Sequence, residues 1–311
     1  MRKVLITNYV HDHLPEGLTK MGYIVEYDQN FDPQDLTSVL PDLCGIVINS
    51  KIKMTREMQA LAPKLEFIAR LGSGLEIIDL VAAEENGIAV YNSPEGNRNA
   101  VAEHAIGMLL GLANNIRRGD ASVRQKLWNR EEHRGFELEG KTLGIIGLGN
   151  TGRELARKLS PWALRLIYND PYVLEVPKDL ANITYTDINQ LQQDADIISL
   201  HVQLTHQTRG MVDYDFLKKC RKGVILINTS RGAVVQTEGL VRALEEGHVS
   251  GACLDVFENE KPHSFTLEEN QLFERLYAMD NVVLTPHVAG WTHESLWKIA
   301  DVLLDKIRSL K

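Results

Sequence analysis

The chain has 311 residues, of which 44% are hydrophobic and 24% are charged, and its formal net charge is −8. This composition is typical of a globular protein, and the length suits two domains better than one core. The acidic balance and the lack of a basic stripe argue against nucleic acid as a partner. No apolar run is long enough to predict a membrane span.

The three cysteines, Cys44, Cys220 and Cys253, are isolated from one another and lie in or beside apolar segments. A metal site clusters its ligands and a disulfide framework pairs its cysteines, so this pattern favours buried free thiols. The first seven residues run directly into a strand-like segment and lack the features of a signal peptide. We therefore expect a cytoplasmic protein without a metal site.

Short apolar runs alternate with helix-like segments through the first third of the chain. The runs predicted as strands are residues 3–7, 24–27, 45–48, 66–71 and 88–91. Asp32 followed by Pro33 is typical of a helix start, and Thr55 predicts the start of another helix. Such alternation predicts parallel strands joined by crossover helices.

A long pattern of apolar residues at helical spacing predicts a helix over residues 100–118 that bridges two domains. After a polar, irregular stretch, a second alternating series begins at Thr142. Its predicted strands are residues 143–146, 164–168, 197–200, 224–228, 251–254 and 282–284, and a last helix is predicted over 293–310. We expect residues 1–98 with 292–311 to form one domain, and residues 99–291 to form the other.

A glycine pattern follows the first strand of the second series. Residues 147–152 have the form G-x-G-x-x-G, between the apolar run 143–146 and a helix-like segment over 153–159. Glycines at these places allow a tight turn, close approach of a pyrophosphate, and packing of the helix on the strand. The free N–H groups of that helix then face the phosphates. The residues predicted to bind the dinucleotide here are Gly147, Gly149, Asn150, Thr151 and Gly152.

Asp170 ends the next predicted strand, 18 residues after Gly152. This spacing is close to that of the carboxylate that binds the ribose hydroxyls in dinucleotide-binding folds. A carboxylate there would repel a 2′-phosphate, so the sequence favours NAD over NADP. The alternative interpretation is a structural turn with a solvated aspartate.

Three further segments, residues 227–232, 254–260 and 284–290, each stand at the end of a predicted strand. They supply a cation, a carboxylate and an imidazole, which are the groups that reduction of a 2-oxo acid requires. Arg231 can clamp the substrate carboxylate with a planar fork, and His287 can give a proton to the carbonyl oxygen. Glu260 can hydrogen-bond the other imidazole nitrogen and fix the tautomer.

Each of these three residues also has a structural explanation when it is taken alone. An arginine after a strand often makes a salt bridge, and a histidine after proline is often an ordinary loop residue. Glu260 lies in a polar stretch that could simply be solvated. Their coincidence at strand ends, behind a dinucleotide-binding pattern, favours catalysis.

With these motifs the chain resembles the D-isomer-specific 2-hydroxyacid dehydrogenases. The resemblance is carried by residues 147–152 with Asp170, by 228–232, by Asp255-Val256-Phe257 with Glu260, and by Pro286-His287. It implies two doubly wound parallel-sheet domains, a flavodoxin-like substrate domain and a Rossmann NAD-binding domain, in a homodimer with the active site in the cleft. The roles of Arg231, Glu260 and His287 agree with those already inferred. The resemblance further implies that Thr229 and Asp255 bind the cofactor, with Asp255 near the nicotinamide carboxamide.

The resemblance extends into the first domain, where residues 70–76 look like the family's glycine-rich substrate loop. It implies that the backbone N–H groups of Ser73 and Gly74 bind the substrate carboxylate. Glu76-Ile77 stands where the family often has Asp-Asn, which leaves the exact substrate pocket in question.

The identity of the substrate depends on the first domain. Lys51, Lys53 and Arg70 lie at or near the ends of its predicted strands and would suit a phosphate or a second carboxylate. They resemble residues of the family's 3-phosphoglycerate dehydrogenases, and the alternative is that the lysines are simply solvated. 3-Phosphoglycerate is the leading substrate. Glyoxylate or hydroxypyruvate reduction, D-lactate-type chemistry, and the non-enzymatic role of the family's NAD-sensing co-repressors are the alternatives. No appended regulatory domain is expected after residue 311.

Overall fold

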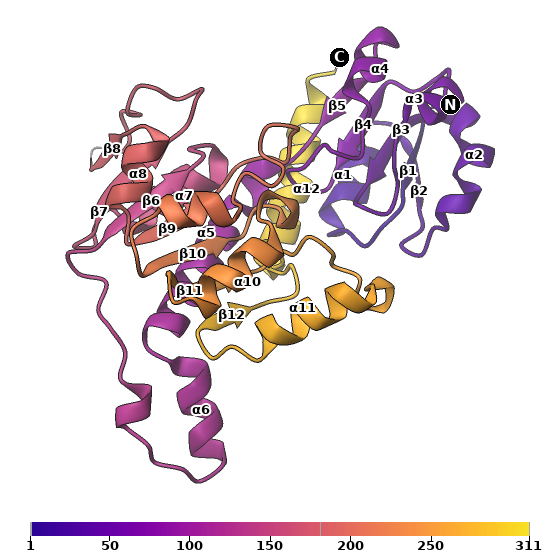
Figure 1. Ribbon diagram of the computed structural model, residues 1–311. Helices are drawn as coiled ribbons and strands as arrows, with labels where there is room; N and C mark the ends of the chain where they lie inside the picture. Colours follow the sequence, from indigo (N-terminus) through magenta and orange to yellow (C-terminus); the bar gives the residue numbers. More distant parts are fainter. Residues whose placement is uncertain (1, 181, 311) are drawn as a thin grey trace. The chain divides into compact units, whose positions relative to one another are not determined.

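The computed structural model describes residues 2–180 and 182–310. It contains two compact units, one formed by Met1–Arg98 with Trp291–Lys311 and the other by Asn99–Gly290. Each unit has its own parallel sheet with helices on both faces (Figure 1). The units are called below the first and the second unit.

The first unit contains a five-stranded parallel sheet in the order β2-β1-β3-β4-β5. This is the flavodoxin-like order that was predicted. Its strands are β1 (Lys3–Ile6), β2 (Ile24–Tyr27), β3 (Leu43–Ile48), β4 (Phe67–Arg70) and β5 (Ala89–Tyr91). Its helices are α1 (His13–Lys20), η1 (Pro33–Asp35), α2 (Leu36–Val39), η2 (Leu40–Asp42), α3 (Arg56–Ala60), α4 (Leu80–Glu85) and α12 (His293–Arg308).

Two apolar clusters hold these helices on opposite faces of the first sheet. Helices α1 and α12 bury Leu18 and Leu304 against one face, whereas α2 and α4 bury Leu36 and Ala83 against the other. The predicted helix starts are confirmed, because Asp32 accepts the N–H of Gln34 and Thr55 accepts that of Met58. The carboxyl ends of the strands are thereby fixed at one edge of the sheet.

The second unit contains a seven-stranded parallel sheet in the order β12-β11-β10-β9-β6-β7-β8. Renumbered from β6, this is the Rossmann order 3-2-1-4-5-6 with one strand added, as predicted. Its strands are β6 (Thr142–Ile146), β7 (Arg165–Asn169), β8 (Ile183–Tyr185), β9 (Ile197–Leu200), β10 (Val224–Asn228), β11 (Val249–Leu254) and β12 (Val282–Leu284). Its helices include α7 (Asn150–Leu159), α8 (Ile188–Asp194), α9 (Tyr214–Lys219), η4 (Gly232–Val234), α10 (Thr237–Glu245), η5 (Pro262–Ser264) and α11 (Leu267–Tyr277).

The helix predicted over residues 100–118 is wrong in its extent. The structure has α5 (Pro94–Ala113), then a break, then α6 (Ile116–Arg124) and η3 (Glu131–His133). The break lies at Asn115, whose φ of 50° is left-handed, a conformation that asparagine tolerates better than most residues. Because the chain turns there, Ile116 is 58% exposed, and α6 extends away from the sheet of its unit (Figure 1).

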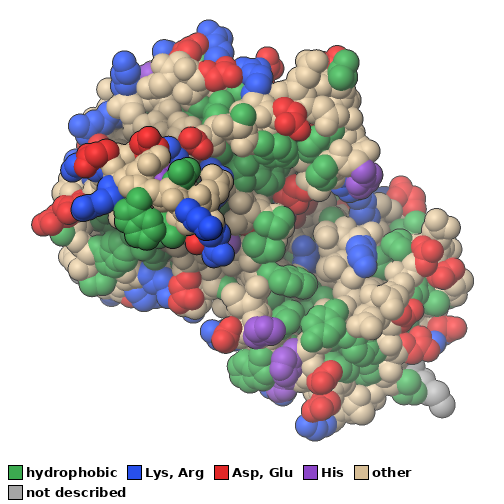
Figure 2. Space-filling model, turned by 90° about the horizontal axis from the view of Figure 1, so that it is seen from below, with side chains coloured by type: hydrophobic (Ala, Val, Ile, Leu, Met, Phe, Trp, Pro, Cys, Tyr) green, Lys and Arg blue, Asp and Glu red, His purple; other side chains and the backbone are tan. Residues whose placement is uncertain are grey.

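The remaining general predictions concern the cysteines and the membrane. All three cysteines are buried and free, as predicted, and burial raises the pKa of Cys220 and Cys253 to about 12. Within residues 2–180 and 182–310, no helix combines the length and the apolar character needed to cross a bilayer. On the face shown in Figure 2, basic and acidic side chains are interspersed.

Candidate active site

The glycine loop of the second unit joins β6 to the first turn of α7. Gly147 has φ of +93°, and a Cβ atom there would lie 2.8 Å from the carbonyl of His201. A Cβ atom at Gly152 would lie 2.1 Å from the carbonyl oxygen of Gly147, so the helix packs on the turn only without a side chain. Gly149 faces open space, and Asn150 and Thr151 begin the helix. The loop therefore leaves backbone exposed at the position where a phosphate would approach.

Asp170 follows β7 and is 8% exposed. One carboxylate oxygen accepts the N–H of Leu148 at 2.7 Å, and the other accepts that of Tyr172 at 2.8 Å. The side chain is thus fixed against the glycine loop. Because each carboxylate oxygen can accept more than one hydrogen bond, both retain capacity for a ribose hydroxyl.

The loop after β10 is shaped by Asn228, whose side chain is fully buried. Its amide donates to the carbonyl of Arg231 at 3.0 Å, and its oxygen accepts the N–H and hydroxyl of Ser230. These three hydrogen bonds fix the course of the loop and present Arg231 beyond the end of the strand. In the same loop, directly after Asn228, the buried hydroxyl of Thr229 has no hydrogen-bond partner among the described residues. A buried, unpaired hydroxyl at this edge suits a polar ligand.

Gly232 brings the loop after β10 against the loop after β11. A Cβ atom at this residue would lie 1.8 Å from the carbonyl oxygen of Phe257. No side chain can be accommodated there, because the neighbouring atom belongs to the backbone. The segment that carries Arg231 therefore packs directly on the segment that leads to Glu260.

His287 and Glu260 form a hydrogen-bonded pair, with 2.8 Å between the imidazole Nδ1 and the carboxylate Oε2. Their side chains are 49% and 39% exposed. The hydrogen bond from Glu260 raises the pKa of His287, against the opposing effect of burial. Burial raises the pKa of Glu260, but the contacts with His287, the N–H of Phe257 and the charge of Arg231 together outweigh it, so this pKa is lowered overall. The pair therefore favours a protonated ring with a fixed tautomer, and it leaves Nε2 available to a reactant.

Asp255, at the end of β11, is 1% exposed, and its carboxylate is engaged by the loop after β12. One oxygen accepts the Thr285 hydroxyl at 2.6 Å and the N–H of Val288 at 2.9 Å. The other accepts the N–H of Ala289 at 2.8 Å. Asp255 thus fixes the loop that carries His287. The prediction placed Asp255 near the nicotinamide and did not include this contact with the loop.

The predicted substrate loop belongs to the first unit and follows β4. Gly72 has φ of +120°, and its N–H donates to the buried hydroxyl of Ser93 at 3.0 Å. Asn92 donates to the carbonyl of Ser73 at 2.8 Å. Within the described part of the chain, the N–H groups of Ser73 and Gly74 have no acceptor. They are available to an anion.

The three predicted cations of the first unit lie at the same edge of its sheet. Arg70 is the last residue of β4 and is half-buried, whereas Lys51 and Lys53 are exposed in the segment after β3. Arg70 is paired with Ile48 in the register of the two strands. The cations therefore follow neighbouring strands.

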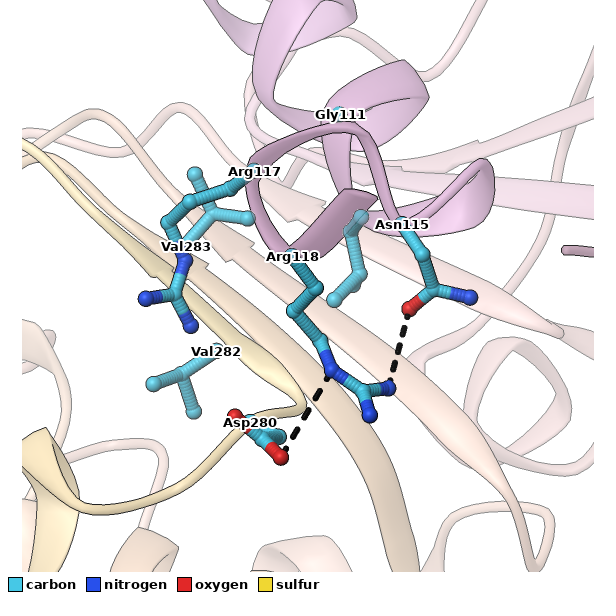
Figure 3. A pocket seen from close by; sticks show the side chains of 8 residues that line it. Gly111, Asn115, Arg117, Arg118, Asp280, Val282 and Val283 are labelled. Atoms are coloured by element: carbon cyan, nitrogen blue, oxygen red, sulfur yellow. Dashed lines mark hydrogen bonds and ion pairs between the residues drawn. The ribbon is translucent and has the colours of Figure 1, made fainter. Parts of the chain in front are cut away.

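Within the second unit, Arg231, Glu260 and His287 follow β10, β11 and β12, which are neighbours in the sheet. The glycine loop and Asp170 follow β6 and β7 at the same, carboxyl edge, where ligands bind in open α/β sheets. A small hollow at the opposite edge is lined by Asn115, Arg118, Asp280 and Val282, with an ion pair between Arg118 and Asp280 (Figure 3). That hollow contains none of the predicted site residues.

The sequence reasoning missed three residues that support the site, namely Asn228, Thr285 and His104. Asn228 and Thr285 lie in the motifs that drew attention to Arg231 and His287, but no role was assigned to them. His104 lies within α5 and contacts Thr285 through its imidazole Nε2 at 3.0 Å. A polar side chain on the otherwise apolar face of a predicted helix was the signal available for it.

Comparison with known proteins agrees with the geometry. The family model described as D-isomer specific 2-hydroxyacid dehydrogenase, NAD binding domain, matches residues 106–289. A D-3-phosphoglycerate dehydrogenase of Methanocaldococcus jannaschii is 34% identical over the whole chain, and a hydroxypyruvate reductase of Thermotoga maritima is 35% identical over 90% of it. The crystal structure of a D-lactate dehydrogenase from Aquifex aeolicus, complexed with NAD and lactic acid, superposes with a TM-score of 0.84 at 29% identity, covering 98% of this chain and 94% of that one.

The lengths of these relatives differ. The match covers 88% of the hydroxypyruvate reductase but only 57% of the phosphoglycerate dehydrogenase. The chain thus spans little more than half the length of the curated phosphoglycerate dehydrogenases that it matches.

Fold, site and comparisons together define an α/β protein with a dinucleotide-binding unit. The chain belongs to the family of D-isomer-specific 2-hydroxyacid dehydrogenases, and its second unit contains the NAD-binding domain of that family.

Proposed function

We propose that the protein interconverts a small D-2-hydroxy acid and its 2-oxo acid with NAD as the cofactor. The observation that carries this proposal is the His287–Glu260 pair, with imidazole Nδ1 held at 2.8 Å and Nε2 available. Arg231 follows β10, which lies next to β11, the strand that precedes Glu260, and one strand removed from β12, which precedes His287. An acid/base and a carboxylate clamp at one edge of an NAD-binding domain are the groups that this reaction needs.

The residues of the second unit fit NAD. The open backbone at Gly149 and the start of α7 suit the pyrophosphate, and the carboxylate of Asp170 suits the ribose hydroxyls. The unpaired hydroxyl of Thr229 supplies a further polar contact. When bound, the cofactor supplies or accepts the hydride.

The side chains would then act as follows in the reductive direction. Arg231 binds the substrate carboxylate through its planar fork. His287 gives the proton on Nε2 to the carbonyl oxygen as C2 is reduced, while Glu260 holds the proton on Nδ1. In the oxidative direction, the neutral imidazole takes the hydroxyl proton back. For the first unit, we propose that the N–H groups of Ser73 and Gly74 bind a carboxylate.

3-Phosphoglycerate is the substrate that we propose first. Its phosphate suits the cations Lys51, Lys53 and Arg70, and relatives named D-3-phosphoglycerate dehydrogenase are 33–34% identical to this chain. Hydroxypyruvate or glyoxylate and D-lactate are the alternatives, supported by a hydroxypyruvate reductase and a structurally similar D-lactate dehydrogenase.

The experiment that tests the function is NADH oxidation with a panel of 2-oxo acids. We expect 3-phosphohydroxypyruvate to give the highest kcat/KM, ahead of hydroxypyruvate, glyoxylate and pyruvate. A higher kcat/KM for a 2-oxo acid without a phosphate would show that 3-phosphoglycerate is not the substrate. The proposed reaction would still hold. Failure with every acid would overturn the enzymatic proposal and favour an NAD-sensing module.

A homodimer is proposed from the family resemblance, and the second unit offers a surface that suits it. The side chains of α6 and the segment after it include large exposed apolar groups. These are Ile116, Val123, Leu127, Trp128 and Phe136. Contiguous exposed apolar patches often mark protein interfaces. The homodimer and the cytoplasmic location stay predictions.

We predict a strong preference for NADH over NADPH, because the buried carboxylate of Asp170 would repel a 2′-phosphate. Asp170→Ala should narrow the ratio of kcat/KM for the two cofactors. Asp196→Ala is the matched control, since Asp196 also accepts a backbone N–H, that of Thr142, but at the amino edge of the sheet. Steady-state rates with both cofactors decide the matter, and equal values for the wild type would refute the role of Asp170.

The reductive rate should fall as pH rises through the pKa of His287, because the reaction needs the protonated ring. Glu260 raises that pKa, so Glu260→Gln should move the fall of kcat/KM to lower pH. Glu258→Gln is a suitable control, because Glu258 accepts the N–H of Thr237 and takes no part in the pair. An unchanged alkaline limb in Glu260→Gln would show that Glu260 does not set the protonation of His287.

A further inference from the structure

We propose that His104 is a positioning residue for His287, acting through the hydroxyl of Thr285 and the carboxylate of Asp255. The inference rests on the acid/base role proposed above for His287. His104 lies in the middle of α5 (Pro94–Ala113), and the proposed function assigns no role to its side chain. The contacts below lie wholly within the second unit.

The direction of the hydrogen bonds follows from the chemistry of the three groups. The Thr285 hydroxyl lies 2.6 Å from Asp255 Oδ1 and 3.0 Å from His104 Nε2. An ionised carboxylate only accepts, so the single hydroxyl proton of Thr285 goes to Asp255. The hydroxyl oxygen must then accept from His104, which therefore carries its proton on Nε2. This nitrogen is also 3.6 Å from Asp255 Oδ1.

The chain of hydrogen bonds ends at the backbone of His287. The N–H of His287 donates to the carbonyl of Asp255 at 2.8 Å, and the two following N–H groups donate to the carboxylate. His287 itself has φ of 55°, a left-handed conformation that is uncommon for residues other than glycine and costs free energy. Such a conformation persists only where the surroundings impose it. Here the imposing group is Asp255, and Thr285 and His104 fix the orientation of its carboxylate.

The position of the carboxylate also matters electrostatically. The charge of Asp255 adds to that of Glu260 in raising the pKa of His287, whereas Arg231 opposes them. Asp255 is 1% exposed, so its charge is little screened by water. A shift of this carboxylate would therefore change both the direction of the imidazole and its protonation.

Helix α5 provides a rigid base for His104. Its side chain is 25% exposed, and its neighbours Ala102 and Ala105 are fully buried in the core of the second unit. Met108, one turn further on, contacts the Thr285 hydroxyl through its sulfur at 3.8 Å. The helix thus holds the loop after β12 through side chains that follow one another at helical spacing.

The test compares His104→Leu, which removes the donor, with His104→Gln, whose amide nitrogen can replace Nε2. We expect His104→Leu to lower kcat about tenfold, the size expected for one lost hydrogen bond in a charged network. KM for the 2-oxo acid and the Kd of NADH should change little, because Arg231 and Asp170 are untouched. The alkaline limb of the pH–rate profile should move to lower pH, and His104→Gln should recover most of kcat.

Two further measurements separate positioning from a general effect on the fold. The titration of the His287 ring, followed by NMR without substrate or cofactor, should shift to lower pH in His104→Leu. The control is His248→Leu, because His248 also donates a hydrogen bond through Nε2, to the carbonyl of Cys220 at 3.0 Å, at the amino edge of the sheet. This control should lower the Tm and leave kcat and the pH profile unchanged.

The outcomes are distinct. Inactivity of the wild type towards every 2-oxo acid would refute the proposed function, whereas an active wild type with an equally active His104→Leu would refute the inference alone. Equal damage in His104→Leu and His104→Gln would also overturn it, because packing and not the hydrogen bond would then matter. If His104→Leu does not fold, Thr285→Val and Thr285→Ser make the same comparison, and equal rates in that pair overturn the inference.

Discussion

His287→Asn is expected to lower kcat by about 10²–10⁴-fold, the usual contribution of general acid–base catalysis. Asparagine is the appropriate replacement because the backbone at this residue has φ of 55°, which asparagine tolerates and alanine does not. The loop should therefore keep its course, and the effect should report the missing proton donor. NADH affinity should stay near that of the wild type.

The measurement is steady-state turnover of the best 2-oxo acid beside NADH binding by fluorescence. His248→Asn serves as the control, since His248 lies at the other edge of the sheet. A variant of His287 with normal kcat would end the mechanism proposed here, and a proton donor would have to be sought elsewhere.

Arg231→Ala is expected to lower kcat/KM for the 2-oxo acid about ten- to several-hundredfold. The reason is the loss of a bidentate pair with the substrate carboxylate, since hydrogen bonds to charged groups contribute about 1.5–3 kcal/mol each. Arg231→Lys should recover only part of the rate, because an ammonium is a point charge without the planar fork. NADH binding should be little changed in both variants.

Arg221→Ala is the matched control for this experiment. Arg221 forms an ion pair with Asp196 at 2.9 Å at the amino edge of the sheet, and its loss should affect stability alone. Full activity in Arg231→Ala would mean that another group binds the carboxylate. A 2-hydroxy acid would then cease to be the preferred class of substrate.

The strands of both sheets could largely be predicted from the sequence, because buried parallel strands are short apolar runs with polar ends. The bounds predicted for β9, β10 and β12 agree with the structure residue for residue. Strand β8 was missed, since it has three residues and two of them are exposed, so it presents no apolar run. The break at Asn115 was missed because the apolar spacing continues through it.

The site was predictable to the extent that its residues lie directly after strands. Parallel strands bring their carboxyl ends to one edge, so the order of the strands is enough to gather Arg231, Glu260 and His287. The contacts that orient them join residues far apart in the chain, such as His104 and Thr285, and no local pattern encodes that pairing. The same holds for Asp255, whose hydrogen bonds with the loop after β12 only the fold reveals.

The close contact between Gly232 and Phe257 has a consequence for engineering. The loops after β10 and β11 pack against each other at Gly232, where no side chain fits. A Cβ atom at this residue would lie 1.8 Å from the carbonyl oxygen of Phe257. Substitution of Gly232 should therefore yield mostly inactive clones, whatever new substrate is sought. A library aimed at a different acid should therefore keep Gly232 unchanged and vary other positions.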